Sequence, residues 1–103
     1  MKTRTSDAVE ILRRRIGDDP EMKALIAEAR ANREVAQLVH DLRTSAGLTQ
    51  KELADRIGTS QSTIARLEDA HYTGHTLNVL SRICAALGRN LELHCPIKDR
   101  AAA

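Results

Sequence analysis

Residues 49–68, TQKELADRIGTSQSTIARLE, decide the fold because their apolar and polar side chains follow the spacing of two short helices joined by a tight turn. Thr49 and Ser60 each precede a helical pattern, and a hydroxyl there can accept a hydrogen bond from an unpaired amide of the first turn. Gly58 separates the two patterns and can adopt the positive φ that a sharp turn requires. The apolar residues of the two predicted helices face one shared core: Leu53, Ala54, Ile57, Ile64 and Leu67.

The polar side chains of the same stretch lie on the opposite side from this core. They are Gln50, Gln61, Ser62, Thr63 and Arg66. Two helices at a steep angle with a polar outer face form a helix-turn-helix, the unit that lays its second helix in the DNA major groove. Gln can pair bidentately with adenine and Arg with guanine, whereas Ser and Thr can contact either a base or a phosphate. We therefore favour DNA contact over a merely solvated helix face.

The composition excludes several other classes of protein. Tyr72 is the single Phe, Trp or Tyr residue among 103, which favours small packed helices and argues against stacking of single-stranded nucleic acid. We find no nucleophile–base–acid set and no glycine-rich phosphate loop, so we expect neither an enzyme nor a cofactor. The spacing of His71 and His75 relative to Cys84 and Cys95 does not match a compact metal site. The sequence shows no membrane span or secretory signal, and we expect a cytoplasmic protein.

The charge pattern bears on how such a chain would bind DNA. The net charge is +2, and residues 41–69 carry four basic side chains against five acidic ones. Affinity from counterion release grows with the number of phosphates contacted, so one copy should bind DNA weakly. Two copies on adjacent half-sites would double those contacts. The charge count therefore predicts a homodimer.

The N-terminal third of the chain reads as a helical extension. Residues 6–16 have the pattern of a short helix, and Asp19 and Pro20 suit the cap and first position of a second one that continues to about Ser45. We expect the C-terminal half of this long helix to pack on the helix-turn-helix and its N-terminal half to project or to meet a partner. The apolar residues of that N-terminal half are Met22, Leu25, Ile26 and Ala29.

The C-terminal part reads as one more helix followed by a strand. Thr76 suits the cap of the helix and Gly88 its end. In residues 90–97, NLELHCPI, apolar Leu91, Leu93 and Cys95 alternate with polar neighbours, which is a strand pattern. A lone strand needs a partner, and the simplest partner is the same strand of a second copy. We predict that it forms the dimer contact.

With GLTQKELADRIGTSQSTIARLE, followed by LSRICAALG, the chain resembles the phage repressor and Cro-like helix-turn-helix family over residues 35–88. The resemblance implies an all-α, lambda-repressor-like bundle. It implies that Gln50 contacts a phosphate and braces the second motif helix. In that helix Ser60, Gln61, Ser62 and Arg66 occupy base-facing and backbone-facing positions. Arg43 and Lys51 flank the motif and are our candidates for phosphate contacts, and we also predict that Thr49 and Thr63 belong to the DNA-binding residues.

The wider layout resembles the HigA-type antitoxins, because a helical extension (residues 1–34) precedes the DNA-binding domain (35–88) and a predicted strand (89–100) follows it. That resemblance implies a dimeric repressor of its own operon that binds a palindromic operator. It also implies a partner, a RelE/HigB-like mRNA-cleaving toxin. Two alternatives stay open: a stand-alone phage-type repressor, and a protein-interaction module that does not bind DNA.

Overall fold

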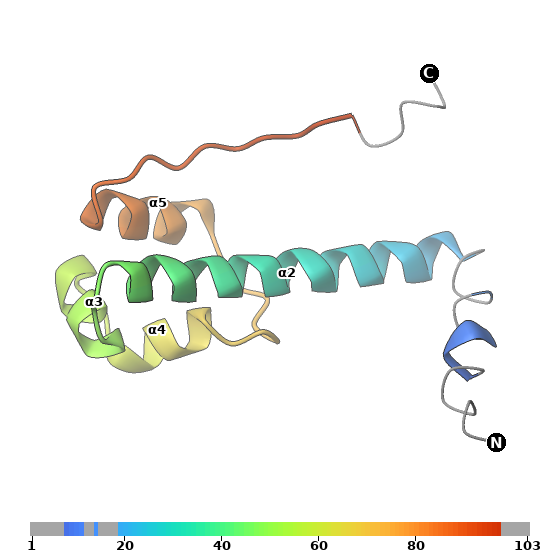
Figure 1. Cartoon of the computed structure of the whole chain (residues 1–103), viewed down its shortest axis with the longest axis horizontal. Helices are drawn as coiled ribbons and strands as arrows, with labels where there is room; N and C mark the ends of the chain where they lie inside the picture. The colour runs from blue at the N-terminus through green and yellow to red at the C-terminus, as the bar shows by residue number, and fades with distance from the viewer. Residues whose placement is uncertain (1–7, 12–13, 15–18, 98–103) are drawn as a thin grey trace.

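The computed structural model describes residues 8–11, 14 and 19–97. Four helices follow one another along residues 19–97 (Figure 1): α2 (Pro20–Ser45), α3 (Gln50–Ile57), α4 (Gln61–Leu67) and α5 (Leu77–Ala86). Residues 8–11 and 14 are also helical, and the remainder of the helix predicted at 6–16 lies outside the described residues. The largely helical expectation is thus confirmed for this part of the chain.

The long helix α2 begins where the sequence predicts. The Asp19 carboxylate accepts hydrogen bonds from the amides of Glu21 at 3.0 Å and Met22 at 3.3 Å, and Pro20 occupies the first helical position. The buried residues of this 26-residue helix are Ala36 and Val39, both in its C-terminal half. That half lies beside α3, α4 and α5, whereas the N-terminal half extends away from them (Figure 1).

Side-chain caps begin both short helices of the motif, α3 and α4. Thr49 Oγ1 accepts from the Glu52 amide at 3.1 Å, while the Glu52 carboxylate accepts from the Thr49 amide at 2.8 Å. These bonds with Thr49 lower the pKa of Glu52 below its usual value. Gly58 ends α3 with a φ of 73°, a left-handed conformation that costs other residues free energy. Ser60 Oγ then accepts from the Thr63 amide at 3.2 Å to begin α4. The caps and the turn predicted from the sequence are confirmed.

The core lies where α2, α3, α4 and α5 meet. All five residues predicted for it from the 49–68 stretch are buried. The buried cluster comprises Val39, Leu53, Ala54, Ile57, Ile64, Leu67 and Ile83. Thr76 caps α5 by accepting from the Val79 amide at 3.1 Å, and Arg82 of the same helix donates to the Ile57 carbonyl at the end of α3. These contacts hold α3 and α4 against the other two helices.

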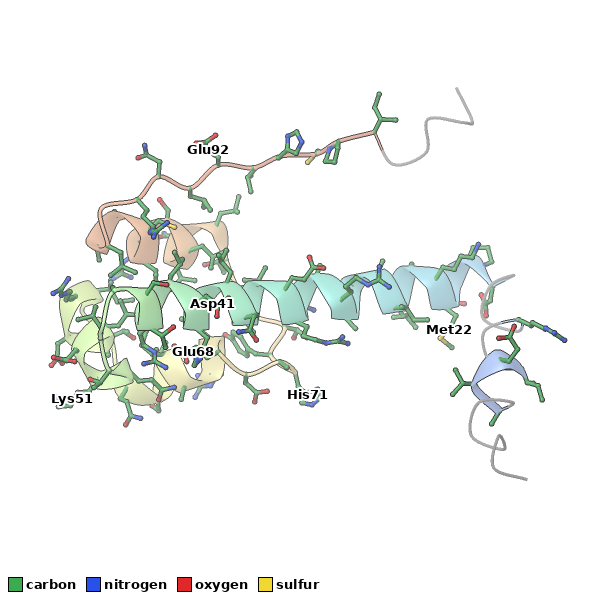
Figure 2. All side chains as sticks on the ribbon, in the orientation of Figure 1. Met22, Asp41, Lys51, Glu68, His71 and Glu92 are labelled. Atoms are coloured by element: carbon green, nitrogen blue, oxygen red, sulfur yellow. The ribbon has the colours of Figure 1, made fainter. Side chains whose placement is uncertain are left out.

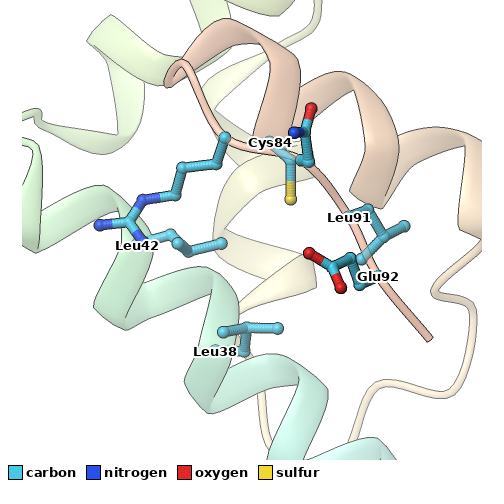
Figure 3. Close-up of a pocket in the computed structure, with 7 residues that line it drawn as sticks. Leu38, Leu42, Cys84, Leu91 and Glu92 are labelled. Atoms are coloured by element: carbon cyan, nitrogen blue, oxygen red, sulfur yellow. The ribbon is translucent and has the colours of Figure 1, made fainter. Parts of the chain in front are cut away.

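The strand predicted in residues 90–97 is wrong for the single chain. No residue of 19–97 is in a strand, and this segment runs in an extended path on the far side of α5 from α3 and α4 (Figure 1). Leu93 and Cys95 are exposed. Leu91 is partly buried and lines a pocket with Leu38, Leu42 and Cys84, among others (Figure 3). The alternating pattern marks one apolar face, but a strand also needs a neighbouring backbone, and the described part of the chain offers none.

No helix within the described residues combines the length and the apolar character needed to cross a membrane.

Candidate nucleic-acid interface

The first residues of α3 and α4 are joined by their side chains. Gln61 Nε2 donates to Gln50 Oε1 at 3.0 Å, so the two glutamines predicted as DNA contacts are neighbours in space although 11 residues apart in sequence. Gln61 is exposed and Gln50 is half-buried. Because each glutamine begins a capped helix, their positions are set by both caps and by the core below. The structure therefore places a fixed pair of amide groups at this edge of the domain.

Hydroxyl groups cluster beside this pair at the start of α4. Ser60 Oγ lies 3.1 Å from Ser62 Oγ and 2.9 Å from Thr63 Oγ1. Ser60 and Ser62 are exposed, as is Arg66 one turn further along the helix. The exposed face of α4 thus carries amide, hydroxyl and guanidinium groups together. These groups can donate to and accept from base edges and phosphates.

A largely buried ion pair supports this face from within. Glu68, at the end of α4, accepts from Arg43 Nε at 2.7 Å and from Arg43 Nη2 at 3.0 Å, in a two-point contact between α4 and α2. Gln50 Nε2 also donates to the Glu68 carboxylate, at 3.3 Å, and His40 Nδ1 lies 3.0 Å from it. The side chains of Glu68 and Arg43 are 6% and 12% exposed. One carboxylate therefore connects α2, α3 and α4.

The two cations predicted to contact phosphates differ in placement. Arg43 also donates to the Leu48 carbonyl at 2.8 Å, so its guanidinium is used to hold the fold together. Lys51 is exposed at the outer edge of the domain (Figure 2). Its Nζ lies 3.4 Å from the Asp55 carboxylate in a surface pair. A surface ion pair contributes little to stability, so the lysine side chain can turn toward a phosphate at little cost. The phosphate contacts of Arg43 and Lys51 stay predictions. Arg43 also stabilises the fold through its bonds to Glu68 and the Leu48 carbonyl.

Sequence reasoning missed Glu68 and His40 as members of this network. A signal was present at Arg43, which falls on the stripe of α2 that carries the buried residues Ala36 and Val39. A charged side chain on a core-facing stripe requires a partner of opposite charge. That partner is Glu68, the acidic residue next to the buried Leu67. Sequence spacing did not connect it with Arg43, because 25 residues separate Arg43 from Glu68.

The environment of Glu68 changes its acidity. Burial alone would raise the pKa of this carboxyl, but hydrogen bonds from Arg43, His40 and Gln50 outweigh that effect and lower it. The pKa of Arg43 is raised in turn, chiefly by its hydrogen bond to Glu68. Both directions mean that the charged forms are favoured in the folded chain. The pair is thus an ion pair at neutral pH.

We expect acid to weaken the fold through Glu68. Its pKa is lower in the folded chain than in the unfolded one, where it is about 4.3. The unfolded chain therefore binds more protons than the folded chain at pH values just below about 4.3. The contribution of Glu68 to the free energy of unfolding is fully present above about pH 5, and it is lost as the pH falls through the pKa of the folded chain. Urea unfolding at a series of pH values should show the parent's advantage over Glu68→Gln shrinking below about pH 4. An advantage that stays constant to lower pH would contradict this explanation.

The chain belongs to the helix-turn-helix family, whose model matches residues 39–93. The matched residues include all of α3, α4 and α5 but only the C-terminal end of α2, from Val39 onward. An uncharacterized HTH-type transcriptional regulator of Methanothermobacter thermautotrophicus is 44% identical over 52 residues, which are 50% of this chain and 74% of that protein. No solved structure matches the chain significantly.

Proposed function

We propose that this chain is a non-enzymatic, sequence-specific DNA-binding transcriptional regulator that inserts α4 into the major groove. The observation that carries the proposal is the exposed polar face of α4, whose first residue, Gln61, is held by Gln50 and through it by the buried carboxylate of Glu68. Side chains fixed before binding lose little conformational entropy on contact with DNA. Membership of the helix-turn-helix family and the name of the relative from Methanothermobacter thermautotrophicus support the same function.

The charge of the interface supports a dimer on a palindromic operator. The four basic and five acidic side chains of residues 41–69 leave a single copy with few phosphate contacts, and the Arg43–Glu68 pair removes one cation from that small set. Two copies would place their α4 helices in successive major grooves, about 34 Å apart. Binding of this kind would repress transcription from the promoter that overlaps the operator.

The finer assignment that we propose is the antitoxin of a toxin–antitoxin operon, which would repress its own operon and neutralise a RelE/HigB-like toxin. It rests on the resemblance of the layout, in which residues 1–34 supply a surface outside the matched helix-turn-helix region. Co-expression with the product of the neighbouring reading frame tests it. A stable complex and relief of growth arrest support an antitoxin, whereas no complex favours a stand-alone repressor.

The double substitution Gln61→Ala with Arg66→Ala should weaken binding to the operator roughly 30-fold or more, because each good bidentate base contact contributes about 1–3 kcal/mol. A gel-shift titration on the DNA upstream of the gene, over a range of salt concentrations, measures this. Gln37→Ala with Arg89→Ala is a matched control, since it removes the same two residue types from exposed positions elsewhere. Equal binding by the test variant and the parent would refute the assigned contacts. Binding of the parent no tighter than to random DNA would favour an interaction module.

A further inference from the structure

The N-terminal half of α2 carries an apolar stripe that nothing in the described part of the chain covers. Met22, Leu25 and Ile26 are 39%, 56% and 41% exposed, and Ala29 is exposed as well. These four positions are spaced as the contact face of an amphipathic helix. We call them the apolar stripe.

This half of α2 would gain stability from a surface that covers it. Figure 1 shows it extending beyond the bundle, and every residue from Pro20 to Ala31 is exposed. The packed C-terminal half of α2 nucleates the helix, but residues 20–31 gain nothing from burial of their own apolar face within the described part of the chain. Most of the stability of helices in proteins comes from packing an apolar face. A surface that covers the apolar stripe would therefore stabilise this half of the helix.

Charged residues border the apolar stripe with opposite sign on its two sides. Glu21 and Glu28 are seven residues apart and share one line along the helix, as do Lys23 and Arg30. Lys23 and Arg30 line a shallow hollow together with Ile26, which places them along one border of the stripe. Because the glutamates stand two positions before these cations, they lie on the other border. Between described residues, none of the four takes part in an ion pair.

This arrangement suits a second copy in one orientation. When two identical helices pack side by side and parallel, the two-fold axis runs along them, and the acidic border of each faces the basic border of the other. When they pack antiparallel, like borders meet and repel each other. The charge pattern therefore favours parallel self-association, by the same rule that sets partner choice in coiled coils.

The positions of the DNA-binding helices favour the same orientation. α3 and α4 lie beside the C-terminal half of α2 (Figure 1). A parallel pair keeps both helix-turn-helix units at one end of the paired stem, where they can reach successive turns of one operator. An antiparallel pair would instead place the two units beyond opposite ends of the paired segment, because the stripe lies in the N-terminal half of α2 and the units lie beside its C-terminal half.

We propose that the apolar stripe of α2 is a self-association surface on which the same stripe of a second copy packs in parallel. This inference deepens the dimer proposed above and rests on it for its use on DNA. Four apolar side chains per copy fall short of the roughly 800 Å² per partner of a standard interface. We therefore expect the paired N-terminal halves of α2, which we call the stem, to associate weakly in solution and more tightly when both copies are bound to one operator. It differs from the contact predicted for Leu91, Leu93 and Cys95, and both can operate in one dimer.

Disulfide trapping tests the orientation in the full-length chain. In a Cys95→Ser background, which removes the exposed thiol, Met22→Cys should form a cross-linked dimer because identical residues meet across a parallel two-fold axis. Ala24→Cys is the control, since it lies on the opposite side of α2 two residues away. Cross-linking of the first variant no faster than the second would overturn the proposal.

Charge reversal tests the partner. Sedimentation equilibrium should show the parent mass rising with concentration from 11.4 kDa toward twice that value. Glu21→Lys with Glu28→Lys should associate roughly tenfold more weakly or worse, and so should Lys23→Glu with Arg30→Glu, because both borders then carry one sign. Mixing the two variants should restore association, which loss of folding could not do.

The outcomes separate this inference from the proposed function. The proposed self-association would be wrong if the parent is a monomer at every concentration, or if parent and charge-reversed chains associate equally. Either result would contradict it even if operator binding is normal. A monomer that binds a neighbouring gene product through the apolar stripe would do the same. If the parent associates as expected but binds no DNA, the proposed function fails and the stem stands. Operator half-sites should bind parent and charge-reversed chains equally, since α4 is unchanged.

Discussion

Replacing Glu68 with alanine is expected to lower the free energy of unfolding by about 1.5–3 kcal/mol, because the largely buried Arg43 loses its charged hydrogen-bond partner. The reason is the position of Arg43, which is 12% exposed and would keep its charge without a counter-ion. The His40 and Gln50 side chains would lose their shared acceptor as well. A small domain is stable by only about 5–15 kcal/mol, so the loss would be a large part of the total.

Urea denaturation followed by circular dichroism measures this change. Asp55→Ala is the matched control, because it also removes a carboxylate from an ion pair, but one whose aspartate is 66% exposed. Its effect should stay within about 1 kcal/mol, as for other surface pairs. A Glu68→Ala variant as stable as Asp55→Ala would show that the buried pair is not needed. Replacing both Arg43 and Glu68 with apolar residues should cost less than Glu68→Ala alone, since no charge is left unpaired.

The same carboxylate links stability to the proposed DNA contacts. Glu68 orients Gln50, and Gln50 in turn accepts from Gln61. In Glu68→Gln, which can keep one hydrogen bond while losing the charge, the chain should fold and the position of Gln50 should become less fixed. Glu68 is therefore a positioning residue for the proposed interface, two hydrogen bonds away from the first residue of α4.

Local features of this fold were predictable from the sequence. The caps at Thr49 and Ser60 and the left-handed Gly58 depend on residues within three or four positions of one another. The core positions follow from helical spacing within the same short stretch. Such features need no knowledge of the remaining chain, because the physical forces that produce them act over one or two turns.

Features that depend on distant segments were not predictable in the same way. The pattern of residues 90–97 correctly shows that Leu91 differs from its polar neighbours, but the existence of a strand depends on a second backbone. The Arg43–Glu68 pair depends on how α2 and α4 cross, which spacing along one helix cannot give. Helical spacing places Arg43 on the core-facing side of α2, but it does not identify Glu68 as its partner.

Shortening Ile64 to alanine is expected to cost about 2–5 kcal/mol, because it removes buried methyl and methylene groups and leaves a cavity. Ile64 is 0% exposed, and it shares with Leu67 the task of anchoring the seven-residue α4 to the core. A helix of seven residues is not stable by itself in water. Weaker packing of α4 on the core should therefore lower both the stability of the fold and the affinity for the operator. Ile64→Val should keep most of both, at a cost of about 0.5–1.5 kcal/mol.

Thermal unfolding and the gel-shift titration, carried out on the same variants, measure the two effects. Leu77→Ala is the control for loss of an aliphatic side chain, since Leu77 is 57% exposed at the start of α5. If Ile64→Ala and Leu77→Ala are equally stable, α4 is not held by its buried face. If Ile64→Ala is destabilised but binds the operator as tightly as the parent at temperatures where both are folded, the recognition face does not depend on this anchor. The expected result is a joint loss, because the residue that packs α4 onto Leu53 and its neighbours also fixes where Gln61 and Arg66 stand.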